Sequence, residues 1–201
     1  DGVDNPTLIN SSPWTFNRVI NAGDAELYGF EFSFSRRLDD LLPEAFRGFT
    51  FEGNYAAFES EVQLLAEERV RPVSRTGEVV EVDPTVPLFR QPDRTANLSL
   101  LFERWGIFAR VSYNLRGQYL DSLFVGDDVG ALLRFEDSPA ALDRYVDETE
   151  RWDFTLRYNA TDWLQVFLEV INFTNEPQLR YLGTTDRPHS VRYTDPIYTI
   201  G

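Results

Sequence analysis

Adjacent carboxylates are the most frequent groups in this sequence that could carry out chemistry. They occur at Glu67 and Glu68, at Asp127 and Asp128, and at Asp147, Glu148 and Glu150. A glycoside hydrolase needs two such groups fixed across a cleft, and the spacing here selects no pair. Charge runs of this kind are typical of solvated surface loops. We therefore predict no catalytic residues and no enzymatic activity.

Metal and cofactor sites have equally little support in the sequence. Residues 126–130, Gly-Asp-Asp-Val-Gly, offer carboxylates to calcium but lack the regular spacing of oxygen ligands in known calcium loops. His189 is the single histidine, so neither a catalytic triad nor a zinc site can be assembled around it. No phosphate loop or dinucleotide fingerprint is present. We expect no metal and no cofactor.

The charge balance argues against nucleic acid as a partner. The 201 residues include 33 Asp and Glu against 19 basic residues, which gives a formal net charge of -14. Such a chain repels phosphate backbones. No apolar run approaches the ~20 residues of a membrane helix, whereas a membrane β-barrel needs only ~9–11 residues of alternating apolarity in each strand. The composition therefore allows a membrane barrel.

Apolar and polar residues alternate with a period of two through much of the sequence, which predicts β-strands. In the stretch 28–35 every second residue is bulky and mostly apolar, namely Tyr28, Phe30, Phe32 and Phe34. The same alternation recurs over residues 49–57, 95–103, 107–116, 152–159 and 164–170. The opposite parity mixes hydroxyl, amide and charged side chains, as expected for a water-filled or plugged barrel lumen.

Connections between the expected strands alternate between short and long. Residues 104–106 and 159–162 form short turns, and 36–48 is a compact link with room for one helical turn. Two long polar segments, about 60–93 and 118–150, separate them, and residues 69–82 resemble a hairpin. Aromatic residues gather near the strand ends, at Trp105, Tyr113, Trp152, Tyr158 and Trp163. This alternation favours an up-and-down membrane barrel, because loops over ~15 residues are rare in compact soluble domains.

Two motifs resemble those of TonB-dependent outer-membrane receptors. Residues 20–34, INAGDAELYGFEFSF, resemble a barrel strand of that family with the pattern N-x-G-x-A-x-x-x-G-x-E. Its positions here are Asn21, Gly23, Ala25, Gly29 and Glu31. Residues 166–177, VFLEVINFTNEP, resemble the penultimate strand, whose signature falls on Asn172, Phe173 and Asn175. The segments QPDRTANLSL and FARVSYNLRGQYLD follow the family's order between them.

The resemblance implies an all-β fold, an antiparallel up-and-down transmembrane β-barrel. The family barrel has 22 strands around a plugged lumen, and residues 1–201 would be its C-terminal portion. Seven strands are expected over about 14–37, 48–62, 93–104, 106–118, 149–159, 162–181 and 191–201. The plug domain is expected to be absent from this chain, and the last strand is cut short at Gly201. Seven strands do not close, and open edges in lipid are costly, so we expect the chain to function only within a longer polypeptide.

The resemblance also implies active uptake across the outer membrane of a Gram-negative bacterium. The ligand would be an iron chelate, cobalamin, another metal or a carbohydrate, and TonB would supply the energy through the missing N-terminal part. Long loops would be extracellular and short turns periplasmic, with outer-membrane lipid, the rest of the barrel and the plug as partners. Ligand contact would fall to residues 67–83 and 119–147 and to lumen-facing Arg110, Asn114 and Arg116. These arginines could pair with an anionic ligand or balance carboxylates in the lumen.

Two other classes of protein remain open. A secreted soluble β-sandwich that binds a carbohydrate or a protein would use the phenylalanine faces as the core between two sheets. A passive porin-like barrel would share the alternation but not the pattern from Asn21 to Glu31. In the receptor, Tyr28, Phe30, Phe32 and Phe34 face lipid; in the sandwich they are buried.

Overall fold

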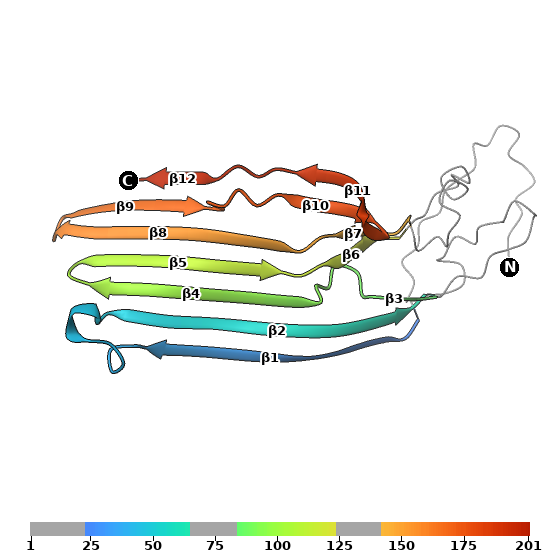
Figure 1. The fold of residues 1–201 in the computed structure, drawn as a ribbon, viewed down its shortest axis with the longest axis horizontal. Coiled ribbons are helices and arrows are strands. Elements are labelled where there is room, and N and C mark those ends of the chain that lie inside the picture. The colour runs from blue at the N-terminus through green and yellow to red at the C-terminus, as the bar shows by residue number, and fades with distance from the viewer. Residues whose placement is uncertain (1–22, 65–83, 124–141) are drawn as a thin grey trace, which may run out of the picture.

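One long antiparallel sheet dominates the computed structural model, which describes residues 23–64, 84–123 and 142–201 (Figure 1). Its hydrogen-bonded order is β1-β2-β4-β5-β8-β9-β12, with the short β3 paired to β2. The strands are β1 (Ala25–Arg37), β2 (Phe49–Gln63), β3 (Thr85–Val86), β4 (Arg94–Arg104), β5 (Ile107–Arg116), β8 (Thr149–Thr161), β9 (Leu164–Ile171) and β12 (Ile197–Ile200). The main path therefore contains seven strands, in chain order.

A smaller sheet lies at the end of the molecule where the long segments emerge (Figure 1). Its order is β11-β10-β7-β6, from β6 (Tyr119–Ser122), β7 (Arg144–Val146), β10 (Gln178–Leu182) and β11 (Thr184–Arg192). A buried apolar cluster lies at the same end and consists of Val62, Leu64, Val86 and Leu120. The buried apolar cluster therefore lies at this end of the sheet, and Val62 is its contribution from the long strand β2.

The expected strand boundaries hold for most of the main sheet and differ near the C-terminus. The strand expected over 162–181 is divided into β9 and β10, because Asn172 and Asn175 adopt left-handed backbone angles between them. β11 and β12 replace the single strand expected over 191–201. β3, β6 and β7 lie in segments expected to be loops. Residues 14–22 and the hairpin expected over 69–82 lie outside the described residues.

Strand register places the alternating residues of neighbouring strands in phase. Phe32 pairs with Tyr55, and Tyr55 pairs in turn with Ala96. Leu100 pairs with Val111, and Val111 with Phe154. Because directly paired residues project from the same side of a sheet, these pairs define one apolar face. The other parity forms a polar face, for example Asn54 beside Asn97 and Asn97 beside Asn114.

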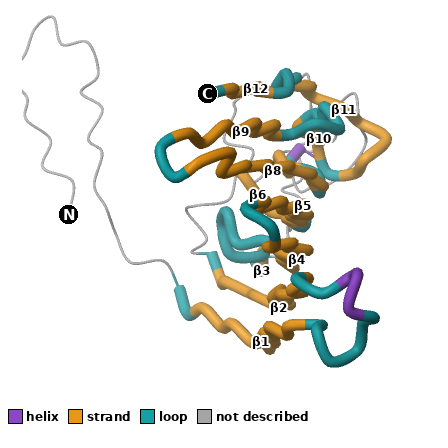
Figure 2. The backbone as a smooth tube through the Cα atoms, turned by 90° about the vertical axis from the view of Figure 1, so that its left-hand side faces the viewer, coloured by secondary structure: helices purple, strands orange, loops and turns teal. Residues whose placement is uncertain are grey.

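No described element forms a second layer against the apolar face. Figure 2 looks along the strands and shows the main sheet as a single layer from β1 to β12. Phe30 and Phe32 are 61% and 59% exposed, and Leu100 on the central strand β4 is still 43% exposed. The core of a soluble sandwich would bury these side chains. The apolar face thus remains an outer surface, as expected for a barrel strand.

The described chain has one named helical element, the three-residue 3-10 helix η1 (Glu44–Phe46). No helix in the described ranges is long and apolar enough to cross a membrane.

Two kinds of connection join the strands at the end opposite the long segments. Trp105 and Gly106 form a two-residue turn between β4 and β5 with φ of 56° and 74°, as this tight hairpin geometry requires. Residues 38–48, which contain η1, form a longer β1–β2 link. Asp39 closes this link, because its Oδ1 accepts a hydrogen bond of 2.7 Å from the Gly48 backbone N–H. Its Oδ2 accepts one of 2.5 Å from Arg37 Nε.

The closure of the β1–β2 link is predicted to depend on pH. The Gly48 N–H, with a smaller contribution from Arg37, lowers the pKa of Asp39 below its usual 3.8, although partial desolvation opposes the shift. The pKa of Asp39 is lower in the folded protein than in the unfolded protein. Ionised Asp39 therefore stabilises the folded link at pH values above its unfolded-state pKa, and this stabilisation is lost as the pH falls through its folded-state pKa. We therefore expect the protection of the Gly48 amide from hydrogen exchange, corrected for intrinsic rate, to fall below about pH 4.

Asp39→Asn is the matched test of this closure. The variant should reduce the protection of Gly48 at neutral pH and flatten its dependence on acid. Equal protection in both proteins across the acidic range would show that Asp39 does not close the link.

Candidate functional site

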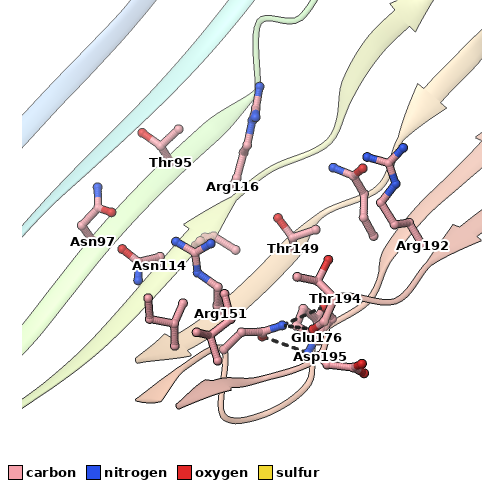
Figure 3. Close-up of a pocket in the computed structure, with 15 residues that line it drawn as sticks. Thr95, Asn97, Asn114, Arg116, Thr149, Arg151, Glu176, Arg192, Thr194 and Asp195 are labelled. Atoms are coloured by element: carbon pink, nitrogen blue, oxygen red, sulfur yellow. Dashed lines mark hydrogen bonds between the residues drawn. The ribbon is translucent and has the colours of Figure 1, made fainter. Parts of the chain in front are cut away.

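A cavity of about 630 Å³ opens on the polar face of the sheet (Figure 3). It lies at the end of the sheet opposite the short turns. Residues from β4, β5, β8, β9, β10, β11 and β12 line it, together with residues of the segments between β9 and β10 and between β11 and β12. Its charged members are Arg116, Arg151, Arg192, Glu176 and Asp195. Three arginines therefore face two carboxylates, which makes the lining favourable for a polar ligand that carries negative charge.

Asn172 lines this cavity and fixes three segments to one another. Its Nδ2 donates to the Thr194 carbonyl at 2.8 Å and, over 3.4 Å, to the Glu176 carbonyl. Its Oδ1 accepts from the Glu176 backbone N–H at 3.0 Å. The residue is 3% exposed and has a φ of 56°, a conformation that asparagine tolerates better than most residues. One side chain thus ends β9 and positions the segment that leads into β12.

Asp153 connects this turn to the sheet. Its Oδ1 accepts from the Asn172 backbone N–H at 2.8 Å, and its Oδ2 accepts from Asn114 Nδ2 at 2.9 Å. Arg151, two residues earlier on β8, lies 3.5 Å from the same carboxylate. The expected ligand contact Asn114 therefore uses one of its amide donors within the protein.

The two arginines predicted as ligand contacts occupy different places on the polar face. Arg116 lines the cavity, and its guanidinium lies 4.3 Å from the ring centre of Tyr119. Arg110 lies outside the cavity lining, and its Nη2 donates to Ser99 Oγ at 3.0 Å. The structure thus brings Asn114 and Arg116 together in one site, without Arg110.

Four further charged residues of the cavity were not predicted from the sequence: Arg151, Arg192, Glu176 and Asp195. Arg151 carried a usable signal, because it shares the polar parity of β8 with Asp153. Arg192 carried none, since its place opposite Gln178 depends on the pairing of β11 with β10. Within the described part of the chain, neither Arg116 nor Arg192 makes an ion pair with a carboxylate.

Comparison with known families decides the identity of the sheet. Residues 2–173 match the family model described as TonB dependent receptor-like, beta-barrel. The chain belongs to this TonB-dependent receptor family. No curated protein and no solved structure gives a significant match. Membership indicates an outer-membrane receptor or transporter.

Signature residues of the receptor family have structural roles in the first strand. Gly23, Ala25, Gly29 and Glu31 share the polar face of the β1 region, and Asn21 lies outside the described residues. A Cβ at Gly29 would lie 2.6 Å from Cδ1 of Phe58, and one at Gly23 would lie 2.3 Å from the Gln63 carbonyl oxygen. The glycines therefore allow β1 to pack closely against β2.

The second signature of the receptor family shapes the turn after β9. Phe173 donates its backbone N–H to the Trp152 carbonyl at 3.0 Å, and the two rings lie 6.4 Å apart. The Asn175 N–H donates to the Asn172 carbonyl at 2.9 Å. Signature residues Asn172, Phe173 and Asn175 thus build the turn after β9.

Other groups singled out in the sequence form no reactive centre in the described ranges. Glu148 accepts two hydrogen bonds from Arg94, at 2.8 and 2.5 Å, and Asp147 caps the Glu148 N–H at 2.9 Å. His189 is exposed on β11. No cluster of three or more potential metal ligands occurs among the described residues. The remaining acidic pairs and residues 126–130 fall outside them.

Asn172→Ala is predicted to destabilise the receptor by on the order of 3 kcal/mol, because it removes the hydrogen bonds of a buried side chain and leaves alanine in a left-handed conformation. Asn172→Gly should recover about 1 kcal/mol of this loss by relieving the backbone. Denaturant unfolding of the receptor in detergent micelles measures both values.

Asn175→Gly is the matched control, because Asn175 has a φ of 54° but an exposed side chain. Its effect should stay within about 0.5 kcal/mol. If the variants at 172 and 175 were equally stable, Asn172 would not connect the segments.

Proposed function

We propose that this chain is the C-terminal portion of a receptor barrel that takes up a scarce ligand with energy delivered through TonB. The cavity beside Arg116 and Arg192 contributes to ligand binding. Iron chelates, cobalamin, other metals and carbohydrates are the candidate classes, and the excess of arginine favours a ligand with exposed anionic oxygens. The observation that carries this proposal is an open cavity on the polar face that contains arginines without ion-pair partners in the described chain.

The position of the cavity supports a receptor that admits ligand from the side of the long segments. We propose that these segments are extracellular and that the short turns are periplasmic. A ligand that enters from outside would then meet Arg116 and Arg192 before the middle of the barrel. Arg110, nearer the middle of β5, would act on a ligand only after it had passed the cavity.

The two edges of the sheet support a larger closed barrel. β1 and β12 each have one neighbour, β2 and β9, in the main sheet. In lipid, unpaired backbone groups at such edges cost several kcal/mol each. We propose that the remaining strands of a 22-stranded barrel pair with β1 and β12, and that the plug and the TonB-contacting segment belong to the same longer polypeptide.

Substitution of Arg192 tests the role of the cavity. In the full-length receptor, Arg192→Gln should weaken ligand binding on the order of tenfold, because a hydrogen bond to a charged group contributes about 1.5 kcal/mol. Uptake of labelled iron chelates, cobalamin and oligosaccharides by cells first identifies the ligand, and binding to purified receptor then gives Kd. Deletion of TonB should abolish accumulation and leave surface binding intact.

Arg157→Gln is the control for this experiment. Arg157 belongs to the polar parity but lies towards the short turns, where it stacks on Phe108 at 4.4 Å, and it is outside the cavity lining. Its variant should bind ligand normally. Equal losses in both variants would argue for a general electrostatic effect and against a role for the cavity.

The assignment of the two faces predicts an asymmetric response to new charge. Leu100→Arg on the apolar face of β4 should destabilise the receptor by about 2–4 kcal/mol, as charged residues do near the middle of a bilayer. Asn97→Arg, on the polar face of the same strand, should cost much less. Reversible folding into lipid vesicles measures both, and the reverse order of costs would contradict the proposed facing.

A further inference from the structure

The β1–β2 link exposes two large apolar side chains beyond the sheet. Leu41 is 64% exposed and Phe46 is 61% exposed, although neither belongs to a strand. The other described hairpins at this end have two-residue turns, Trp105-Gly106 and Asp162-Trp163. The link is therefore longer than a chain reversal requires, and a chain reversal does not require its exposed apolar side chains.

Contacts of the link place it against the apolar face of the sheet. The Arg104 guanidinium donates to the carbonyl oxygen of Glu44, the first residue of η1. Arg104 pairs with Ile107 and shares the parity of Phe102 on β4, so it belongs to the apolar face. Gly48 adjoins the same two β4 side chains, since a Cβ there would lie 3.2 Å from Arg104 Cβ and 3.3 Å from Phe102 Cε2. Figure 2 shows the link displaced to one side of β1 and β2.

An aromatic row continues from the link along this edge of the apolar face. The rings of Phe49 and Phe102 lie 4.9 Å apart, and those of Phe102 and Trp105 lie 6.0 Å apart. Arg104 stacks over Trp105 at 4.3 Å. Aromatic rings and arginine together are typical of the boundary between lipid headgroups and acyl chains.

The charges of the link are compatible with an anionic headgroup layer. Asp40 is paired with Arg36 at 2.7 Å, and Asp39 with Arg37 at 2.5 Å. These ion pairs neutralise two carboxylates that would otherwise repel lipid phosphates. The hydrogen bond from Gly48 to Asp39 holds the two ends of the link together, so the link cannot extend far from the sheet.

We propose that the β1–β2 link is an interfacial anchor that inserts Leu41 and Phe46 into the membrane leaflet at the short-turn end of the barrel. The occupant of this surface is lipid at the boundary of headgroups and acyl chains. The inference rests on the outer-membrane placement of the barrel in the proposed function. Its physical basis is continuity between the exposed side chains of the link and the apolar face that meets lipid.

Site-directed spin labelling of the full-length receptor in phospholipid vesicles tests the anchor. Residues 1–201 contain no cysteine, so single cysteines introduced here can be labelled selectively once any cysteine elsewhere in the receptor is replaced. Labels are placed at Phe46, at Phe32 on the apolar face and at Ser33 on the polar face. Collision rates with oxygen, which partitions into lipid, and with a water-soluble nickel chelate are then compared.

The ratio of the oxygen collision rate to the nickel collision rate should be several-fold higher for a label at Phe46 than for one at Ser33. The label at Phe46 should also lie at a shallower depth in the membrane than the label at Phe32. A ratio equal to that at Ser33 would place the link in water. A label inaccessible to both reagents would place it against protein, such as another part of the barrel or a periplasmic partner. Either result would overturn the anchor while Phe32 still reported lipid. If Phe32 itself failed to report lipid, the proposed membrane placement would fail instead.

Discussion

Backbone hydrogen bonding between antiparallel neighbours is the constraint on which the rest of this structure depends. A strand in a bilayer has no water to satisfy its N–H and C=O groups, so each must find a partner in the next strand. Once strands are paired over ten residues or more, register determines which side chains share a face. The pairings from β1 through β9 keep the two parities in phase, so that one face of the sheet is mainly apolar and the other mainly polar. A slip of one residue in any pair would put apolar residues of one strand among polar residues of the next.

Irregular backbone is concentrated at the ends of the long strands, where the environment becomes polar. Asn172 leaves the β-conformation, and its side chain replaces part of the lost ladder by bonding to backbone groups of two other segments. Asp153 accepts the N–H that Asn172 would otherwise leave unpaired. These buried bonds give the signature at Asn172 a structural role in the turn after β9. The same turn leads into β10 and contributes Asn172 and Glu176 to the cavity lining.

The cavity and the link show two uses of arginine in one barrel wall. In the cavity, Arg116 stacks over Tyr119, and neither it nor Arg192 has a carboxylate partner in the described chain. At the opposite end of the sheet, Arg104 stacks on Trp105 and donates a hydrogen bond to the Glu44 carbonyl of the β1–β2 link. Its guanidinium therefore connects the link to the aromatic row. The planar group suits both tasks, because it can accept an aromatic face and also offer several donors to oxygen.

Period-two alternation was sufficient to predict the main strands and the facing of residues such as Phe32 and Ser33, because alternate side chains of a strand must point to opposite sides. The two motifs that contain Gly29 and Asn172 identified the family because each depends on local residue types. Close packing of β1 on β2 requires glycine, and the left-handed turn after β9 favours asparagine. Sequence did not reveal that the expected strand 162–181 breaks at Asn172, or that Arg192 joins Arg116 while Arg110 does not. Those outcomes depend on which strands pair and in what register. Such choices bring together residues far apart in the chain, and only the tertiary structure decides them.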